Sequence, residues 1–483
     1  MIDVFPFEGL PTPVLGLGRS GIAAAHALSR GGAEVWAWDD NEQSRKNAAD
    51  QGINIVDLNG IDWREATSLI LSPGIPHTHP SPHPIVTMAR EVGCEIIGDV
   101  ELLVRTQRDA AFVGITGTNG KSTTTALIGH IFQTSGREAE IGGNLGMPAC
   151  SLEPLGTDGT YILEMSSYQL ELTFSITFDV AVLLNISPDH LERHGGFEGY
   201  IAAKREIFRR QTKPRTAVIG IDDDISRKIY EELYEADEQL VVGISGKERV
   251  HGGVYVKDGI LIDDTEGQET PVMDLRTVPS LQGVHNWQNA AAAYAACKMT
   301  GIQPHAVMAC INSYPGLVHR QEPLAVIDGV GFVNDSKATN GEAAARALAC
   351  FDDAYWIIGG RPKDGGLSAC APYFNRVRHA YLIGEAAMQF AQELDGKVTC
   401  SVSGDLKTAT EKAFADAKQR GMPGSVVLLS PACASFDQFP DFEARGDAFR
   451  DIVEDLPGEF IDPFEEPGVF PGSTDKPDFG GAG

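Results

Sequence analysis

The stretch AFVGITGTNGKSTTTALIGHIF, residues 111–132, decides the fold. Its apolar start predicts a strand over Ala111–Thr116, which runs into a glycine-rich turn and then a helix. Backbone N–H groups of such a turn close on phosphate oxygens, and the helix N-terminus favours the anion. Lys121 is placed to reach the β- and γ-phosphates and Ser122 to ligate Mg²⁺, although Ile115 replaces the first glycine of GxxxxGK[ST]. This order of strand, glycine-rich turn and helix favours a phosphate loop over a glycine-rich turn with a chance lysine.

Short apolar, β-rich runs alternate with alanine-rich helical runs over most of the chain. This alternation is typical of parallel sheets with crossover helices, so the expected fold class is α/β. The predicted domains are residues 1–106, 107–317 and 318–456. Residues 222–280 are polar and turn-rich and are expected to form a β-containing excursion of the middle domain. Residues 457–483 are dense in Pro, Gly and acid and are expected to form a disordered tail.

The composition excludes several classes of partner. The 483 residues include 39 basic and 67 acidic ones, which gives a formal charge of −28. Such a surface repels a nucleic-acid backbone and an anionic membrane, so any phosphate ligand must be bound by local devices. The sequence predicts neither an export signal nor a membrane-spanning helix. The eight scattered cysteines fit reduced thiols in a cytosolic protein.

The first domain contains a second glycine-rich turn, VLGLGRSG, with Gly16, Gly18 and Gly21 in a GxGxxG pattern. Asp39 and Asp40 follow at the end of the next predicted strand. Taken alone, this is a dinucleotide-binding fingerprint and supports a nicotinamide-dependent oxidoreductase. The same geometry suits any nucleotide diphosphate, so the alternative is a site for the nucleotide part of a substrate.

Two segments of the middle domain predict metal and catalytic groups. Glu164 ends an apolar strand, where a lone acid is costly unless it meets a cation. Asp189 and His190 follow another apolar strand, at the edge where α/β sheets bind ligands. The alternatives are a helix N-cap for Glu164 and a turn histidine for His190. Lys204, on the next helix, is either carbamylated beside a metal ion or a solvent-facing lysine.

Other polar residues follow predicted strands or open a predicted helix, where each is either a ligand contact or a turn residue. They are Asn289, Arg320, Asp335, Lys337, Thr339, Lys363, Ser430 and Ser435. The segment PHTHPSPHP, residues 76–84, has three histidines between prolines, a spacing that suits a loop better than a metal site.

These residues lie in motifs that occur in the order TGTNGKST, EMSSYQLE, NISPDHLERH, AAKREIF, GVHNWQNAAAA, HRQE, NDSKATN and SPACASFDQF. Together the motifs closely resemble those of the Mur ligase family of peptidoglycan synthesis. The resemblance covers residues 13–450 and is weakest across 222–280. TGTNGK alone also fits folylpolyglutamate synthases. NDSKATN and SPACASFDQF are more specific, and they point to the member that adds D-glutamate to UDP-N-acetylmuramoyl-L-alanine.

The resemblance implies a cytoplasmic, monomeric ligase that uses ATP and Mg²⁺ and proceeds through an acyl phosphate. It also implies a UDP-binding, Rossmann-like N-terminal domain, a central P-loop ATPase-type domain and a mobile, Rossmann-like C-terminal domain. The implied UDP-substrate residues are Gly16, Leu17, Gly18, Arg19, Ser20, Asp39, Asp40, Ser72, Pro73, Gly74 and Asn144. Arg19 departs from the family pattern, because a smaller residue is usual there.

The implied ATP-binding residues are Gly117, Thr118, Asn119, Gly120, Lys121, Ser122, Thr123, Asn289, Arg320 and Asp335. Lys121, Glu164, His190 and Lys204 are the implied catalytic residues; Ser122, Glu164, His190 and carbamylated Lys204 would ligate the metal. Lys337, Thr339, Lys363, Ser435 and Phe442 would bind D-glutamate. Two rival classes stay open at this stage, the oxidoreductase and a non-catalytic nucleotide switch.

Overall fold

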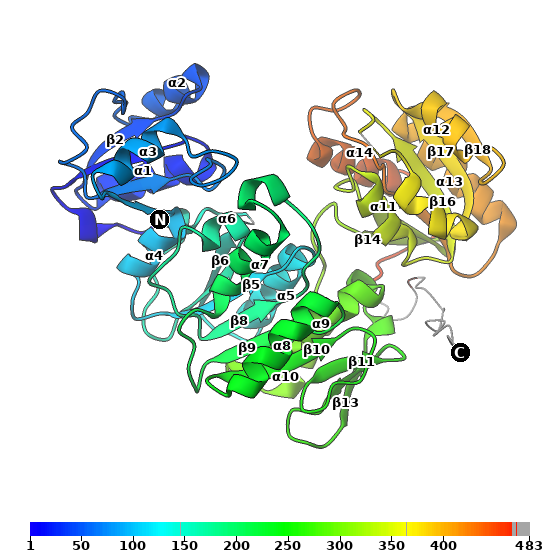
Figure 1. The fold of residues 1–483 in the computed structure, drawn as a ribbon. Coiled ribbons are helices and arrows are strands. Elements are labelled where there is room, and N and C mark those ends of the chain that lie inside the picture. The colour runs from blue at the N-terminus through cyan, green and yellow to red at the C-terminus, as the bar shows by residue number, and fades with distance from the viewer. Residues whose placement is uncertain (145, 364, 466–469, 471–483) are drawn as a thin grey trace. The chain divides into compact units, whose positions relative to one another are not determined.

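The structure is a computed structural model, which describes residues 1–483 except 145, 364, 466–469 and 471–483 (Figure 1). The chain forms two compact units. The first contains residues 1–255, 263–269 and 288–310, and the second contains 256–262, 270–287 and 311–483. In the described part of the chain, no helix is both long enough and apolar enough to cross a membrane.

The first sheet is parallel and has the strand order β2-β1-β3-β4. Its strands are β1 (Pro11–Leu15), β2 (Glu34–Trp38), β3 (Ser68–Leu71) and β4 (Glu95–Ile97). The helices that alternate with them are α1 (Arg19–Arg30), α2 (Glu42–Asp50), α3 (Pro84–Glu91) and α4 (Asp99–Thr106). The glycine-rich turn at residues 16–18 therefore joins β1 to α1, as in a nucleotide-binding βα unit.

The second sheet has the order β13-β12-β11-β10-β9-β8-β5-β7-β6, and the pairs from β11 to β6 are parallel. The strands are β5 (Ala111–Thr116), β6 (Ala139–Gly143), β7 (Thr160–Glu164), β8 (Val180–Leu183), β9 (Thr216–Gly220), β10 (Leu240–Ser245) and β11 (Val254–Lys257). Its helices are α5 (Lys121–Thr134), α6 (Ser167–Leu170), α7 (Phe197–Arg205) and α8 (Asp224–Ala236), and the short 3₁₀ helix η3 spans Leu191–His194. The chain continues through β12 (Ile260–Asp263), β13 (Thr270–Asp274), α9 (Val284–Met299) and α10 (Pro304–Asn312).

The third sheet, in the second unit, has the order β18-β17-β16-β19-β15-β14-β20. Its strands are β14 (Glu322–Ile327), β15 (Val330–Asn334), β16 (Asp353–Gly359), β17 (Val377–Ile383), β18 (Cys400–Gly404), β19 (Ser425–Leu429) and β20 (Phe460–Ile461). The helices are α11 (Gly341–Leu348), α12 (Ala387–Leu394), α13 (Leu406–Arg420) and α14 (Phe442–Glu454). The pairs among β15 to β19 are parallel, whereas β14 pairs antiparallel with both neighbours.

The predicted α/β class with several parallel sheets is confirmed. Two local predictions need correction. The excursion 222–280 has the predicted strands but also contains α8, which packs Ile229 into the core as an amphipathic helix. The predicted disordered tail begins too early, because Phe460–Ile461 form β20 against β14 and Phe470 is buried. Residues 466–469 and 471–483 of that prediction lie outside the described part.

The close packing of Gly114, in β5 of the second sheet, against Phe178 can be tested by substitution. A Cβ atom at Gly114 would lie 2.5 Å from Cε1 of Phe178, and such overpacking costs about 1–3 kcal/mol. We expect Gly114→Ala to lower the free energy of unfolding by that amount in chemical denaturation. Gly156→Ala is the matched control, because a Cβ there would meet no atom within 4 Å. Equal stability of the two variants would contradict the packing.

Candidate active site

The predicted phosphate loop lies between two neighbouring strands of its sheet. β5 pairs with β7 on one side, where Ile115 is opposite Glu164, and with β8 on the other, where Thr116 is opposite Leu183. Parallel strands end at the same edge of a sheet, where ligands of open α/β sheets bind. The segments that follow β7 and β8 therefore flank the loop 117–120.

The loop has a backbone that favours glycine. Gly117 and Gly120 have φ angles of 151° and 84°, a region that side chains rarely adopt. A Cβ atom at Gly120 would also collide with Oδ1 of Asn289, so this predicted ATP-binding residue lies against the loop. α5 begins at Lys121, which puts Ser122 and Thr123 in its first turn, where helix N–H groups have no intrahelical partner.

Two lysines converge on this loop. Nζ of Lys121 donates to the carbonyl oxygens of Gly117, at 2.9 Å, and Thr118, at 3.0 Å. Nζ of Lys204 donates to the same Gly117 oxygen at 2.8 Å, and Lys204 is only 1% exposed. The solvent-facing alternative for Lys204 is therefore wrong. Burial first, and the charge of Lys121 second, lower the pKa of Lys204 well below its usual value, against the opposing effects of Asp189 and Glu164.

Asn185, at the start of NISPDH, is a loop contact that the sequence interpretation missed. Its Oδ1 accepts from the backbone N–H of Asn119 at 2.9 Å, and its backbone oxygen accepts from that of Thr118 at 2.9 Å. The Thr118 hydroxyl lies 3.1 Å from the Tyr200 hydroxyl. The position of Asn185 two residues after the apolar strand β8 was an available signal.

Glu164 is 2% exposed at the end of β7. Its Oε1 accepts from Nδ2 of Asn144 at 2.7 Å, whereas Oε2 is buried and has no hydrogen-bond partner among the residues that the structure describes. Ser166, not Glu164, is the N-cap of α6, so the N-cap alternative is wrong. A buried carboxylate oxygen without a donor fits a cation ligand.

His190 lies in a turn directly before η3, with a φ angle of 51°. Its Nε2 is 3.6 Å from Oδ2 of Asp189, and its ring centroid is 5.2 Å from that of Tyr168. Within the described ranges, no group of three or more His, Cys, Asp or Glu side chains is arranged to bind a metal ion. Mg²⁺ does not need one, because it commonly takes one or two protein ligands together with phosphate oxygens and water.

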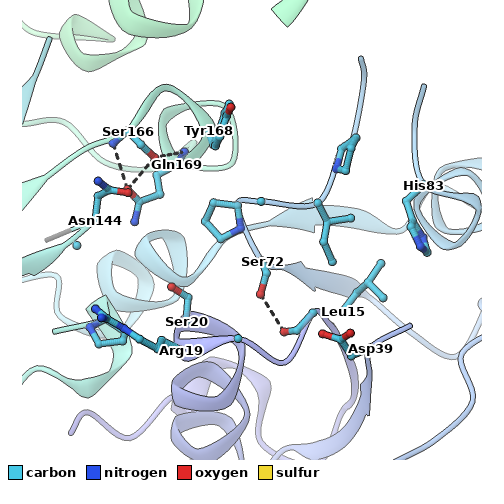
Figure 2. A pocket seen from close by; sticks show the side chains of 18 of the residues that line it. Leu15, Arg19, Ser20, Asp39, Ser72, His83, Asn144, Ser166, Tyr168 and Gln169 are labelled. Atoms are coloured by element: carbon cyan, nitrogen blue, oxygen red, sulfur yellow. Dashed lines mark hydrogen bonds between the residues drawn. The ribbon is translucent and has the colours of Figure 1, made fainter. Parts of the chain in front are cut away.

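A cavity of about 750 Å³ lies in the first unit (Figure 2). Most of the predicted UDP-substrate residues line it: Gly16, Gly18, Arg19, Ser20, Asp39, Asp40, Ser72, Pro73, Gly74 and Asn144. Leu17 is buried and instead donates its backbone N–H to Oδ2 of Asp39 at 2.7 Å. The structure thus brings together residues from four segments that are far apart in the sequence.

Asp39 and Asp40, the acidic pair at the cavity, have different structural roles. Both carboxylate oxygens of Asp39 accept backbone N–H groups, from Leu17 and from Asn41 at 2.8 Å, so this side chain fixes the turn. Oδ2 of Asp40 is 2.9 Å from Nε2 of His83, and this hydrogen bond is the main cause that lowers the pKa of Asp40. His83, together with Ser166, Tyr168 and Gln169, lines the cavity but was not among the predicted site residues (Figure 2).

In the second unit the predicted D-glutamate residues form two contacts. Nζ of Lys337 lies 5.0 Å from the ring centroid of Phe442, a cation–π distance. Nζ of Lys363 is 3.5 Å from Oγ1 of Thr339. Ser435 is buried in the loop after β19. Arg320 is half-buried beside the β14 strand.

Arg445 is a further residue of this region that the sequence interpretation missed. It is 1% exposed and donates to Oγ of Ser336 at 2.9 Å, and to the Cys433 carbonyl at 3.2 Å. It therefore links the loop after β15 to the loop after β19, both of which contain predicted site residues. Burial lowers the pKa of Arg445 to about 10.

Asp335 follows β15 and is 4% exposed. Its Oδ2 accepts from the Ser430 hydroxyl at 2.7 Å and its Oδ1 from the backbone N–H of Gln321 at 3.1 Å. Burial raises the pKa of Asp335 from 3.8 to about 7, although these hydrogen bonds and Arg320 act in the opposite direction.

The raised pKa of Asp335 makes stability depend on pH. As pH rises from about 4 to about 7, the unfolded chain loses this proton while the folded chain keeps it, so the free energy of unfolding falls. We expect Asp335→Asn to lack this contribution, so that wild type loses stability relative to the variant across that range and not above it. Urea denaturation of both proteins as a function of pH measures the difference. Parallel stability curves would contradict the shift.

Comparisons with known proteins agree with this geometry. Residues 115–297 match the Mur ligase middle domain. The chain is 51% identical over 461 residues to the UDP-N-acetylmuramoylalanine–D-glutamate ligase of Rhodospirillum rubrum, covering 94% of this chain and 97% of that one. It is 50% identical to the protein of the same name from Phenylobacterium zucineum, covering 94% and 98%.

Two solved structures share the fold at low sequence identity. The UDP-N-acetylmuramate-alanine ligase of Thermotoga maritima superposes with a TM-score of 0.54 at 16% identity, covering 92% of this chain and 99% of that one. The pseudomurein peptide ligase type C of Methanothermus fervidus gives 0.52 at 17%, with the same coverage. Identity near one half over almost the whole length is decisive for the family. The chain belongs to the Mur ligase family, among the UDP-N-acetylmuramoylalanine–D-glutamate ligases.

Proposed function

We propose that this chain joins D-glutamate to UDP-N-acetylmuramoyl-L-alanine in the cytoplasm, with ATP as the activating substrate. The observation that carries the proposal is the glycine loop 117–120, which opens α5 beside two lysines and the buried carboxylate of Glu164. A loop of this kind binds a triphosphate. In this family, a carboxylate of the substrate accepts the phosphoryl group. The three predicted domains, 1–106, 107–317 and 318–456, and a monomeric enzyme belong to the same proposal.

The cavity of the first unit suits the UDP part of the substrate. The turn after β1 and the N-terminus of α1 offer backbone N–H groups to the diphosphate, and Arg19 offers a cation. Asn144 lines the same cavity and donates to Glu164. The far end of a bound nucleotide sugar is thereby directed toward the edge of the sheet where the phosphate loop lies.

The phosphate loop suits ATP. Lys121 and the first-turn N–H groups of α5 would bind the phosphates, and Asn289, Arg320 and Asp335 the rest of the nucleotide. Ser122, Glu164, His190 and carbamylated Lys204 would ligate Mg²⁺. The ion supplies positive charge that offsets the negative charge developing on the phosphate oxygens.

The reaction requires two displacements. A carboxylate oxygen of the substrate attacks the γ-phosphorus of ATP, the bond to the bridging oxygen breaks, and ADP leaves. The amine nitrogen of D-glutamate, bound by Lys337, Thr339, Lys363, Ser435 and Phe442, then attacks the acyl carbon. The C–N bond forms, phosphate leaves, and the amine gives up a proton. Lys121 neutralises charge and aligns the reactants, which is most of the catalysis that phosphoryl transfer needs.

The substrate specificity is tested by phosphate release. We expect release with ATP and UDP-N-acetylmuramoyl-L-alanine to require D-glutamate, and L-glutamate and D-aspartate to be poor substitutes. Lys121→Ala should lower turnover by at least about 1,000-fold, because it removes a charge that stabilises the transition state. It should leave UDP-sugar binding unchanged in calorimetry. Tight binding of NADH would favour the oxidoreductase, and ATP binding without release under any acceptor would favour a nucleotide switch.

The environment of Lys204 supports carbamylation. Burial, and after it the nearby charge of Lys121, lower the pKa of Lys204, which favours the neutral amine that is nucleophilic toward carbon dioxide. The nitrogen attacks the carbon of CO₂ and loses a proton, which leaves a carboxylate-like ligand.

We expect a carbamate resonance in ¹³C NMR after addition of ¹³C-bicarbonate to wild type. The resonance should be lost in Lys204→Met and kept in Lys213→Met, whose ammonium is exposed and paired with Asp237. A spectrum without the resonance, or one in which Lys204→Met keeps it, would refute the modification.

A further inference from the structure

The three histidines of the loop 76–84 have no role in the proposed reaction, yet each makes a defined contact. The loop directly continues the cavity wall Ser72–Pro76. His83 pairs with Asp40 at the cavity. His77 is buried, and its Nδ1 lies 3.0 Å from Nη2 of Arg193. The ring of His79 lies against Gly195, where a Cβ atom would be 2.7 Å from Nε2.

Arg193 is the centre of these contacts. It is 8% exposed, and its Nη2 also donates to the carbonyl oxygen of Ile75, a cavity-lining residue, at 3.2 Å. Its Nη1 lies 3.5 Å from Oε2 of Glu171. Its guanidinium carbon is 5.0 Å from the ring centroid of Tyr168, another residue of the cavity. One planar cation thus contacts two walls of the cavity, from segments more than 90 residues apart.

Glu171 and His194 complete the network. Oε1 of Glu171 is 2.9 Å from Nδ1 of His194, whose Nε2 is 2.9 Å from the Ser167 hydroxyl. The ring of His194 stacks on Tyr168 with a centroid distance of 5.4 Å. Burial lowers the pKa of His77 to about 4, so its ring is neutral and accepts the Arg193 hydrogen bond. The guanidinium therefore has one carboxylate and two neutral acceptors around it.

The same arginine fixes the turn that contains His190. The backbone N–H of Arg193 donates to the His190 carbonyl at 3.0 Å and closes the first turn of η3. His190 has a left-handed backbone, which the surrounding contacts must maintain. Through its backbone Arg193 contacts the turn of His190, and through its side chain it contacts the cavity wall at Ile75.

We propose that Arg193 is a positioning residue that sets the catalytic turn at His190 against the wall of the UDP-substrate cavity. The inference rests on the proposed function, because it assumes that the nucleotide sugar occupies this cavity and that its carboxylate reacts beside His190. Arg193 does not touch the reacting atoms. It fixes the distance between the place where the substrate is recognised and the place where it reacts.

Arginine is required for this geometry. Its fork donates in two directions within one plane, to Ile75 and to Glu171, whereas a lysine ammonium is a flexible point charge. Arg193→Lys preserves the charge beside Glu171 and therefore most of the stability. It loses the planar link between the two segments.

The test compares Arg193→Lys, Arg193→Met and wild type in phosphate release, with ATP and the nucleotide sugar varied separately. We expect kcat to fall about 10- to 100-fold in both variants, as misplacement of a reactant by a fraction of an ångström would cause, with KM for ATP unchanged. Arg193→Lys should regain the melting temperature of wild type but not its kcat. Arg227→Met is the matched control, because Arg227 pairs with Glu248 on the exposed face of α8.

The proposed function and the positioning role of Arg193 are overturned by different results. If wild type releases no phosphate with D-glutamate, the proposed function fails. If wild type is active and kcat of Arg193→Lys recovers together with its melting temperature, the role is merely structural and the positioning inference is overturned. Loss of activity in Arg227→Met as large as in Arg193→Met would overturn it as well.

Discussion

Two lysine side chains reach the same carbonyl oxygen, that of Gly117 at the start of the phosphate loop. Two ammonium groups at one acceptor repel each other, and Lys204 is almost completely removed from water. Burial, and after it the charge of Lys121, lower the pKa of Lys204 well below its usual value. Lys121 lies at the N-terminus of α5, where an anionic ligand is favoured. The chemistry that we propose for these two lysines follows from their different surroundings at one shared carbonyl oxygen.

Charge repulsion also affects the binding of anionic substrates by the protein as a whole. With a formal charge of −28, it must bind substrates that are themselves strongly anionic. Long-range attraction is therefore unavailable, and binding depends on devices that act within a few ångströms. The structure has such devices: the N-termini of α1 and α5, Arg19 at the cavity, and Lys121 at the loop. High salt should consequently weaken substrate association less than in a protein that steers anions by net charge.

The sequence predicted those parts of the site that depend on local patterns. The glycine loop, Lys121, Glu164 and the turn at Gly16 all follow from residues near one another in the chain. The pairing of β5 with β7 then brings Glu164 to the sheet edge where the glycine loop lies. The N-cap Asp223 of α8 and the Asp328–Gly329 turn between β14 and β15 carried local signals that the sequence analysis did not use. The network around Arg193 could not be predicted, because its partners Ile75 and His77 lie more than 110 residues away. Arg445 was missed for the same reason, since Ser336 is 109 residues away.

The strand order explains why such distant residues meet at all. Because β5 lies between β7 and β8, the register that pairs Ile115 with Glu164 brings this acid beside the loop 117–120. A slip of one residue in that pairing would turn Glu164 to the opposite face of the sheet. The buried, hydrophobic strands make that slip costly, since Tyr161 and Leu163 of β7 would lose their core contacts. Core packing, rather than any bond within the site, therefore fixes the position of the groups that we propose for catalysis.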